Sequence, residues 1–293
     1  MSEGLGFQAN TPIQKLHFSA FGEFGVEVNM KRDDLIHPFV SGNKWRKLRY
    51  NLDACREQGK DGVVTYGGAY SNHLLAVAVA CASAGLKSVG LVRGDELSIR
   101  SNYVLRLCDE YGMKLHFLDR RVFDATSSLA PLGYESFHFV PMGGANREGV
   151  QGCTEILPED HVFNHIVLAV GTGTTFRGVV ESKPAQSMVH GISVVPKTDE
   201  YIGKLNSLVN NEDVRLHFPD DAGIGKWNKS HRDLARSFAS ETGILLDPVY
   251  MSPVISQTLE LMSMKLIKPT QNVLIIHSGG MTGILSDRWL KAD

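Results

Sequence analysis

The sequence lacks the features that mark a membrane, secreted or nucleic-acid-binding protein. None of the apolar runs in its 293 residues approaches the ~20 residues that cross a bilayer. The formal net charge is −2, which provides no basic field for nucleic acid or an anionic membrane surface. The first residues contain neither a basic nor an apolar segment, so we expect no secretory signal. These absences favour a cytoplasmic location.

Cysteine is scarce, and neither the cysteines nor the histidines have the spacing of metal ligands. The four cysteines are Cys55, Cys81, Cys108 and Cys153, and they form no CxxC pair. Three of them lie within apolar helical patterns, where a reduced and buried thiol is expected. The eleven histidines show no metal-ligand spacing, so we predict no metal site.

Alternating apolar runs and helical patterns predict an α/β fold. The length suggests about two domains of ~150 residues each. A strand, a glycine loop and a helix follow one another in residues 61–86, 165–180 and 272–285. Further strands are expected at 87–94, 113–119, 191–197 and 214–219, and further helices at 101–112, 229–243 and from near Asn43. Such alternation favours parallel sheets, with ligands beyond the carboxyl ends of the strands, where all three glycine loops would lie.

The glycine loop GTGTTFRG (171–178) is suited to one phosphate group. Gly173 lets the backbone approach a ligand, and the hydroxyl donors at the start of the helix are Thr172, Thr174 and Thr175. No Gly-Lys-Ser/Thr follows, which excludes a Walker loop, and the third glycine is misplaced for a dinucleotide fingerprint. A plain strand-to-helix turn is the alternative interpretation.

The other two glycine loops also carry polar side chains. In GGAYSNH, Ser71 is a candidate helix cap, and with Asn72 and His73 it could form a donor-rich pocket for a carboxylate or a phenolate. Capping or packing alone would equally explain Ser71 and His73. In the third loop, Ser278 ends a strand, where its hydroxyl either faces a site or belongs to a simple turn.

The segment SGNKWRKL (41–48) places a lysine at the start of a helix. The apolar face of that helix comprises Trp45, Leu48, Leu52 and Cys55. Lys44 lies in the first turn, where the positive end of the helix dipole lowers its basicity, and Arg46 and Lys47 lie within one turn of it. A lysine desolvated near other positive charge is the type that condenses with carbonyl groups, whereas most lysines are simply solvated.

Five segments together resemble a known family. SGNKWRKL, GGAYSNHLLAVA, GTGTTFRG, GILLDPVY and HSGG occur in the order found in the 1-aminocyclopropane-1-carboxylate deaminase and D-cysteine desulfhydrase family. These are pyridoxal-phosphate enzymes of the tryptophan-synthase β fold type. The resemblance implies two α/β domains of parallel or mixed sheets with helices on both faces, a large cofactor-binding domain (1–46 plus 156–293) and a small inserted domain (47–155). It also implies a homodimer.

The resemblance assigns roles residue by residue. Lys44 would hold pyridoxal 5'-phosphate as a Schiff base. The other cofactor-binding residues would be Lys47, Asn72, Thr172, Gly173, Thr174, Thr175 and Ser278. The Ser278 hydroxyl would contact the pyridine nitrogen of the cofactor, and Asn72 would hydrogen-bond to its phenolic oxygen. Besides Lys44, the catalytic residues would be Ser71 and Tyr250, and the small amino-acid substrate would contact Ser71, His73 and Tyr250.

The sequence departs from the family at two of its active-site positions. Met251 follows Tyr250 where the deaminases commonly have a glutamate, and Ile224 stands in place of a second tyrosine, with Trp227 in place of a nearby proline. We therefore expect a lyase that eliminates a β-substituent from a small amino acid, preferably of D configuration, to give a keto acid and ammonia. The alternatives are a 1-aminocyclopropane-1-carboxylate deaminase and a catalytically inactive protein that binds the cofactor.

Overall fold

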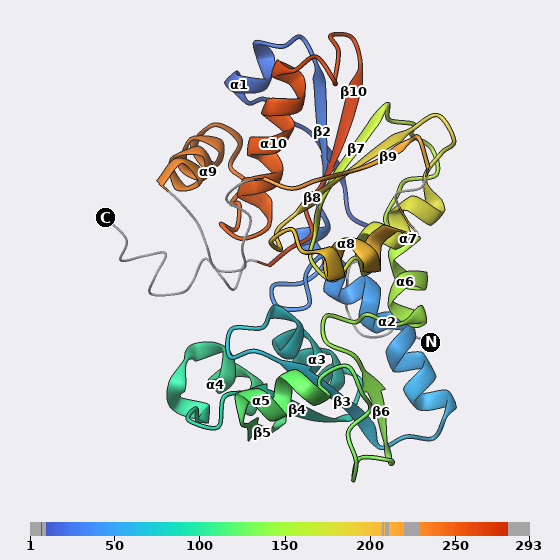
Figure 1. The fold of residues 1–293 in the computed structure, drawn as a ribbon, viewed down its shortest axis with the longest axis vertical. Coiled ribbons are helices and arrows are strands. Elements are labelled where there is room, and N and C mark those ends of the chain that lie inside the picture. Colours follow the sequence, from blue (N-terminus) through green and yellow to red (C-terminus); the bar gives the residue numbers. More distant parts are fainter. Residues whose placement is uncertain (1–6, 8–9, 207, 209–210, 220–228, 281–293) are drawn as a thin grey trace.

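Two separate sheets organise the chain (Figure 1). A computed structural model describes residues 7, 10–206, 208, 211–219 and 229–280. The larger sheet has the strand order β1-β2-β10-β7-β8-β9, and the smaller has the order β5-β4-β3-β6. Every neighbouring pair is parallel except β1 and β2, which are antiparallel. The predicted α/β class, with parallel and mixed sheets, is confirmed.

The strands of the larger sheet come from both ends of the described chain. They are β1 (Ile13–Lys15), β2 (Glu27–Lys31), β7 (His165–Val170), β8 (Met188–Ser193), β9 (Val214–His217) and β10 (Asn272–Ile276). The strands of the smaller sheet come from one continuous stretch. They are β3 (Gly62–Gly67), β4 (Lys87–Arg93), β5 (Lys114–Leu118) and β6 (Phe137–Val140). This arrangement fits an inserted small domain, while the boundaries at residues 47 and 155 stay a prediction.

Helices cover both faces of each sheet (Figure 1). Those of the larger part are α1 (Ser19–Gly22), α6 (Arg147–Cys153), α7 (Thr174–Ser182), α8 (Asp199–Asn206), α9 (Lys229–Thr242) and α10 (Met251–Ser263). Those of the smaller part are α3 (Asn72–Ser83), α4 (Tyr103–Glu110) and α5 (Arg120–Thr126). Helix α2 (Asn43–Glu57) packs against α6 and joins the two parts, and short 3₁₀ turns lie at Asp33–Leu35 and Ile99–Ser101.

Local sequence signals account for several element boundaries. Ser71 caps α3 by accepting a hydrogen bond from the backbone N–H of Leu74 at 3.2 Å, as predicted. Gly85 follows the end of that helix with a φ of +67°, a conformation that glycine adopts without steric cost. The buried strands β3 and β7, each followed by a glycine loop and a helix, also agree with the prediction.

The predicted strand at 191–197 is wrong in its position. Strand β8 spans Met188–Ser193, and the backbone N–H of Val195 turns back to the Ser193 hydroxyl at 3.2 Å. Pro196 follows and has no N–H to offer a neighbouring strand. The helix predicted after β10 lies outside the described residues. Among the described residues, no helix combines the length and apolarity that crossing a bilayer requires.

Three histidines form a hydrogen-bonded ladder across β7, β8 and β9. The Gln271 side-chain oxygen accepts from the backbone N–H of Lys268, and it also accepts from His165 Nε2 at 3.1 Å. His165 Nδ1 is then free to accept from His190 Nε2 at 3.0 Å, and His190 Nδ1 accepts from His217 Nε2 at 3.0 Å. This order fixes one neutral tautomer for each ring, because a proton added to His190 Nδ1 would face the N–H of His217.

The ladder makes the fold sensitive to acid. Burial, with smaller effects from His217 and His165, lowers the pKa of His190 to about 3. The unfolded chain therefore binds this proton more tightly, so stability is fully present above pH ~6.5 and falls by up to about 1.4 kcal/mol per pH unit below it.

When the pH is lowered from about 7.5 to about 5, we expect the melting temperature of His190→Gln to fall less than that of wild type, as measured by circular dichroism. Glutamine can still donate to His165 and accept from His217, but it does not titrate. The exposed His17→Gln control should keep the wild-type dependence. Equal pH dependence for all three proteins would contradict the role of the ladder.

Candidate active site

A backbone contact brings the start of α2 against the loop that follows β10. Gly42 has a φ of +60°, and a Cβ atom added there would lie 1.9 Å from the Ser278 carbonyl oxygen. The same oxygen accepts from the backbone N–H of Asn43 at 3.3 Å. Two segments from opposite ends of the chain, SGNK and HSGG, are therefore joined directly, and this contact positions Lys44 beside the Ser278 loop.

Lys44 lies in surroundings that favour its neutral form. The side chain is half-buried, and its Nζ donates to the Asn43 side-chain oxygen at 2.7 Å. Burial first, and then the positive charge of Lys47, lower the pKa of Lys44 to about 7, although Cys153 and Asp247 act in the opposite direction. A large fraction of such an amine is unprotonated near neutral pH and can act as a nucleophile.

Lys47 is more deeply buried than Lys44 and lies one turn further along α2. Its Nζ donates to the Gly143 carbonyl oxygen at 3.0 Å, and burial lowers its pKa. The Gly143 loop also reaches the predicted phosphate loop, because a Cβ on Gly143 would come within 2.8 Å of the Thr172 side chain. Gly143 was not among the predicted site residues, although its loop is rich in glycine.

The threonine loop forms the predicted start of α7. Gly173 has a φ of +87°, and a Cβ there would lie 2.5 Å from Leu205, so only glycine fits the turn. The hydroxyls of Thr172 and Thr174 are 3.1 Å apart, and Thr175 Oγ1 accepts from the Asn43 side-chain amide at 3.0 Å. Asn43 therefore links Lys44 to this loop, a connection that its position in SGNK could have suggested.

The start of α3 contributes a second group of polar side chains. The Ser71 oxygen accepts from Leu74, which leaves its own O–H able to donate. The side-chain oxygen of Asn72 and Nδ1 of His73 are buried, and neither has a hydrogen-bond partner among the residues that the structure describes. His73 Nε2 lies 3.1 Å from Thr65 Oγ1. Burial, followed by Lys44 and Lys47, lowers the pKa of His73 well below its ordinary value, so this ring is neutral.

Tyr250 and a buried carboxylate lie at the start of α10. Asp247 accepts from the backbone N–H groups of Val249, Tyr250 and Met251 at 2.8–3.1 Å, and burial raises its pKa to about 6. Burial, and then Asp247 and Tyr201, raise the pKa of Tyr250 to about 12, so its hydroxyl stays protonated.

Tyr201 was missed by the sequence interpretation. It lies in α8, and its hydroxyl donates to the Gly171 carbonyl oxygen at 2.8 Å. Gly171 also lies beside the Tyr250 ring, since a Cβ there would be 3.7 Å from it. The two positions where tyrosine and proline were expected, Ile224 and Trp227, lie outside the described residues.

The polar groups fit pyridoxal phosphate. A phosphate suits the threonine loop at the α7 N-terminus, where backbone N–H groups point outward and Lys47 lies nearby. The Lys44 amine, with its lowered pKa, can react with an aldehyde. The Asn72 oxygen and His73 Nδ1, which are buried and unpaired among the described residues, could hydrogen-bond to a ligand. Within the described part of the chain, no cluster of His, Cys, Asp or Glu side chains is arranged to hold a metal ion.

Fold and site together define a pyridoxal-phosphate enzyme of fold type II. The family model described as pyridoxal-phosphate dependent enzyme matches residues 5–279, and the chain belongs to this family. More narrowly, it belongs to the 1-aminocyclopropane-1-carboxylate deaminase and D-cysteine desulfhydrase branch.

Three relatives illustrate this membership. A putative 1-aminocyclopropane-1-carboxylate deaminase of Pyrococcus abyssi is 30% identical over 94% of this chain and 90% of the relative. The D-cysteine desulfhydrase of Serratia proteamaculans is 26% identical over 94% of this chain and 93% of that protein. The crystal structure of an ACC deaminase homologue superposes with a TM-score of 0.81 at 27% identity, covering 98% of this chain and 94% of that one.

The pKa of Lys44 predicts how it reacts with an aldehyde. Only the neutral amine adds to the carbonyl, so the rate of imine formation should rise with pH through a midpoint near 7. Pyridoxal without its phosphate is the suitable probe, because its reaction does not depend on the phosphate loop. Absorbance of the imine formed with cofactor-free protein measures the rate, with Lys44→Ala as the blank. A midpoint near 10 would contradict the buried environment of Lys44.

Proposed function

We propose that the enzyme eliminates the β-substituent of a small D-amino acid, with D-cysteine as the best candidate, to give a keto acid, ammonia and sulfide. The main support is the Lys44 amine beside the Ser278 loop, because its pKa of about 7 leaves a large fraction unprotonated at neutral pH. The protonated Tyr250 hydroxyl belongs to a side chain that lies beside Gly171 of the neighbouring glycine loop. The names of the relatives, a D-cysteine desulfhydrase among them, support the substrate class. A homodimer in the cytoplasm is part of the same proposal.

Each residue of the site has a defined part in this proposal. Pyridoxal phosphate, when bound, supplies an electron sink for the charge that develops at the substrate α-carbon. Lys47 and the threonine loop bind the phosphate, and Asn72 and Ser278 orient the ring. Because the Lys44 amine has a lowered pKa, it can take the α-proton at neutral pH. Proton transfer at the correct carbon then depends on how rigidly α2 holds Lys44.

Tyr250 acts as a proton donor in this proposal. Its pKa of about 12 keeps the O–H intact, so it can protonate a leaving group but cannot serve as a base near neutral pH. The Ser71 hydroxyl is already an acceptor for the helix cap, which leaves its proton to bind the substrate carboxylate. His73, two residues after Ser71 on α3, is neutral, and we assign it to the substrate side of the site.

The position of Met251 favours elimination over ring opening. Its side chain is fully buried and belongs to the hydrophobic core between the larger sheet and helices α9 and α10. That position therefore offers no carboxylate to the cofactor ring. Asp247 is occupied by three backbone N–H groups, which leaves the Ser278 hydroxyl as the group we assign to the pyridine nitrogen. A hydroxyl need not keep that nitrogen protonated, which tempers the electron sink.

A side-by-side assay tests the proposal. We expect D-cysteine to give keto acid with a kcat/KM at least about tenfold above that for 1-aminocyclopropane-1-carboxylate, and Lys44→Ala to abolish turnover of both. Tyr250→Phe should lower kcat by about a hundredfold, because the leaving group loses its proton donor. Faster ring opening would favour the deaminase activity that other relatives are named for. Turnover of neither substrate above that of free cofactor would contradict the proposal.

A further inference from the structure

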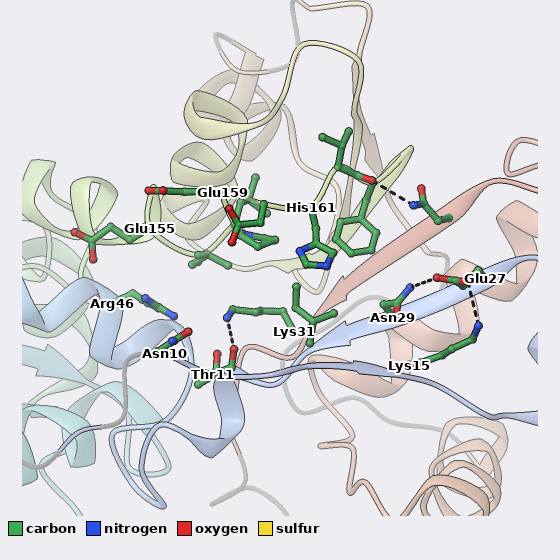
Figure 2. Close-up of a pocket in the computed structure, with 18 residues that line it drawn as sticks. Asn10, Thr11, Lys15, Glu27, Asn29, Lys31, Arg46, Glu155, Glu159 and His161 are labelled. Atoms are coloured by element: carbon green, nitrogen blue, oxygen red, sulfur yellow. Dashed lines mark hydrogen bonds and ion pairs between the residues drawn. The ribbon is translucent and has the colours of Figure 1, made fainter.

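A cavity of about 930 Å³ lies apart from the active-site cluster (Figure 2). Strands β1 and β2 form one wall, residues 155–163 form the other, and Arg46 of α2 closes one end. Arg46 is two positions beyond Lys44, so it projects from roughly the opposite side of the helix. The catalytic residues do not line this cavity, and the proposed reaction does not use it.

The floor of the cavity carries the buried amine of Lys31, whose pKa is lowered by burial, while the nearby Asp33 carboxylate acts in the opposite direction. Lys31 is 6% exposed, and within the described part of the chain its Nζ donates one hydrogen bond, to the Thr11 carbonyl oxygen at 2.5 Å. An ammonium has three donors, and buried N–H groups without an acceptor are costly. The Asp33 carboxylate lies near Lys31, but it accepts hydrogen bonds of 3.0 and 3.1 Å from the Arg46 guanidinium. Figure 2 shows the Lys31 amine directed into the space between the two walls.

The opposite wall has the reverse charge and an apolar surface. Glu159 and Asp160 are exposed at its rim. Apolar side chains that line the same space are Ile13, Ile156, Leu157, Val162 and Phe163. A simple anion would be attracted by the lysine but repelled by the acidic rim. A molecule with an anionic end, a cationic end and an apolar body is complementary to the Lys31 amine, the acidic rim and the apolar lining.

We propose that this cavity is a second ligand site, which binds a free α-amino acid with a large apolar side chain. The carboxylate binds Lys31, the ammonium group lies toward Glu159 and Asp160, and the side chain packs on the apolar wall. The site does not depend on which amino acid the enzyme consumes.

Backbone hydrogen bonds connect this site to the catalytic residues. The Lys31 carbonyl oxygen accepts from the N–H of His277 at 3.0 Å, immediately before Ser278. The Asp33 carbonyl oxygen accepts from the N–H of Gly42 at 2.8 Å, two residues before Lys44. Lys31 and its neighbour Asp33 are therefore hydrogen-bonded to the two segments that meet at the active site.

Calorimetric titration tests the site on holoenzyme reduced with borohydride, whose cofactor can no longer accept an amino group. L-leucine is the probe. 4-Methylpentanoate supplies only the acid, and 3-methylbutylamine only the amine. We expect saturable binding of L-leucine, and binding at least about tenfold weaker for each analogue. Lys31→Met should weaken L-leucine binding by at least about tenfold. Lys15→Met, which alters an exposed lysine of the same cavity that pairs with Glu27, should leave it unchanged.

Glu159→Gln provides a second variant, because this exposed residue can be changed without disturbing the core. We expect it to weaken L-leucine binding by about threefold or more, and it decides the question if Lys31→Met does not fold. The absence of saturable binding to the reduced wild-type enzyme would overturn the proposal. So would affinities in both variants equal to that of wild type.

Discussion

The active site depends on the burial of two amines one turn apart at the start of α2. Burial lowers the pKa of both amines, and the positive charge of Lys47 lowers the pKa of Lys44 further. The close approach of Gly42 to the Ser278 carbonyl oxygen holds this helix end in place. Without that contact, Lys44 would gain solvent, recover its ordinary basicity and lose its value as a nucleophile.

Three of the site groups proposed from the sequence were chosen because each one follows a strand. Ser71, Thr174 and Ser278 all lie just beyond a strand end, where ligands of parallel sheets collect. What the sequence could not give was the contact between distant segments. The hydrogen bond from Lys47 to Gly143 and that from Tyr201 to Gly171 join residues whose local patterns show nothing unusual.

The individual strands were predicted unevenly. Strands rich in valine, such as β3 and β7, were located well, whereas β2, with the sequence EVNMK, was missed because it alternates weakly and carries polar residues. Strand β8 was predicted to begin at Gly191, three residues too late, because His190 looks unlike a strand residue until the histidine ladder is seen. Long-range packing decided these cases over local propensity.

We propose that the Lys44 amine forms the covalent link to the cofactor. Borohydride reduction of the purified enzyme, followed by proteolysis and mass spectrometry, locates that link directly, because reduction converts a reversible imine into a stable amine. We expect a pyridoxyl group on the peptide that contains Lys44. A modification on Lys47 or another lysine, or no modification at all, would contradict it.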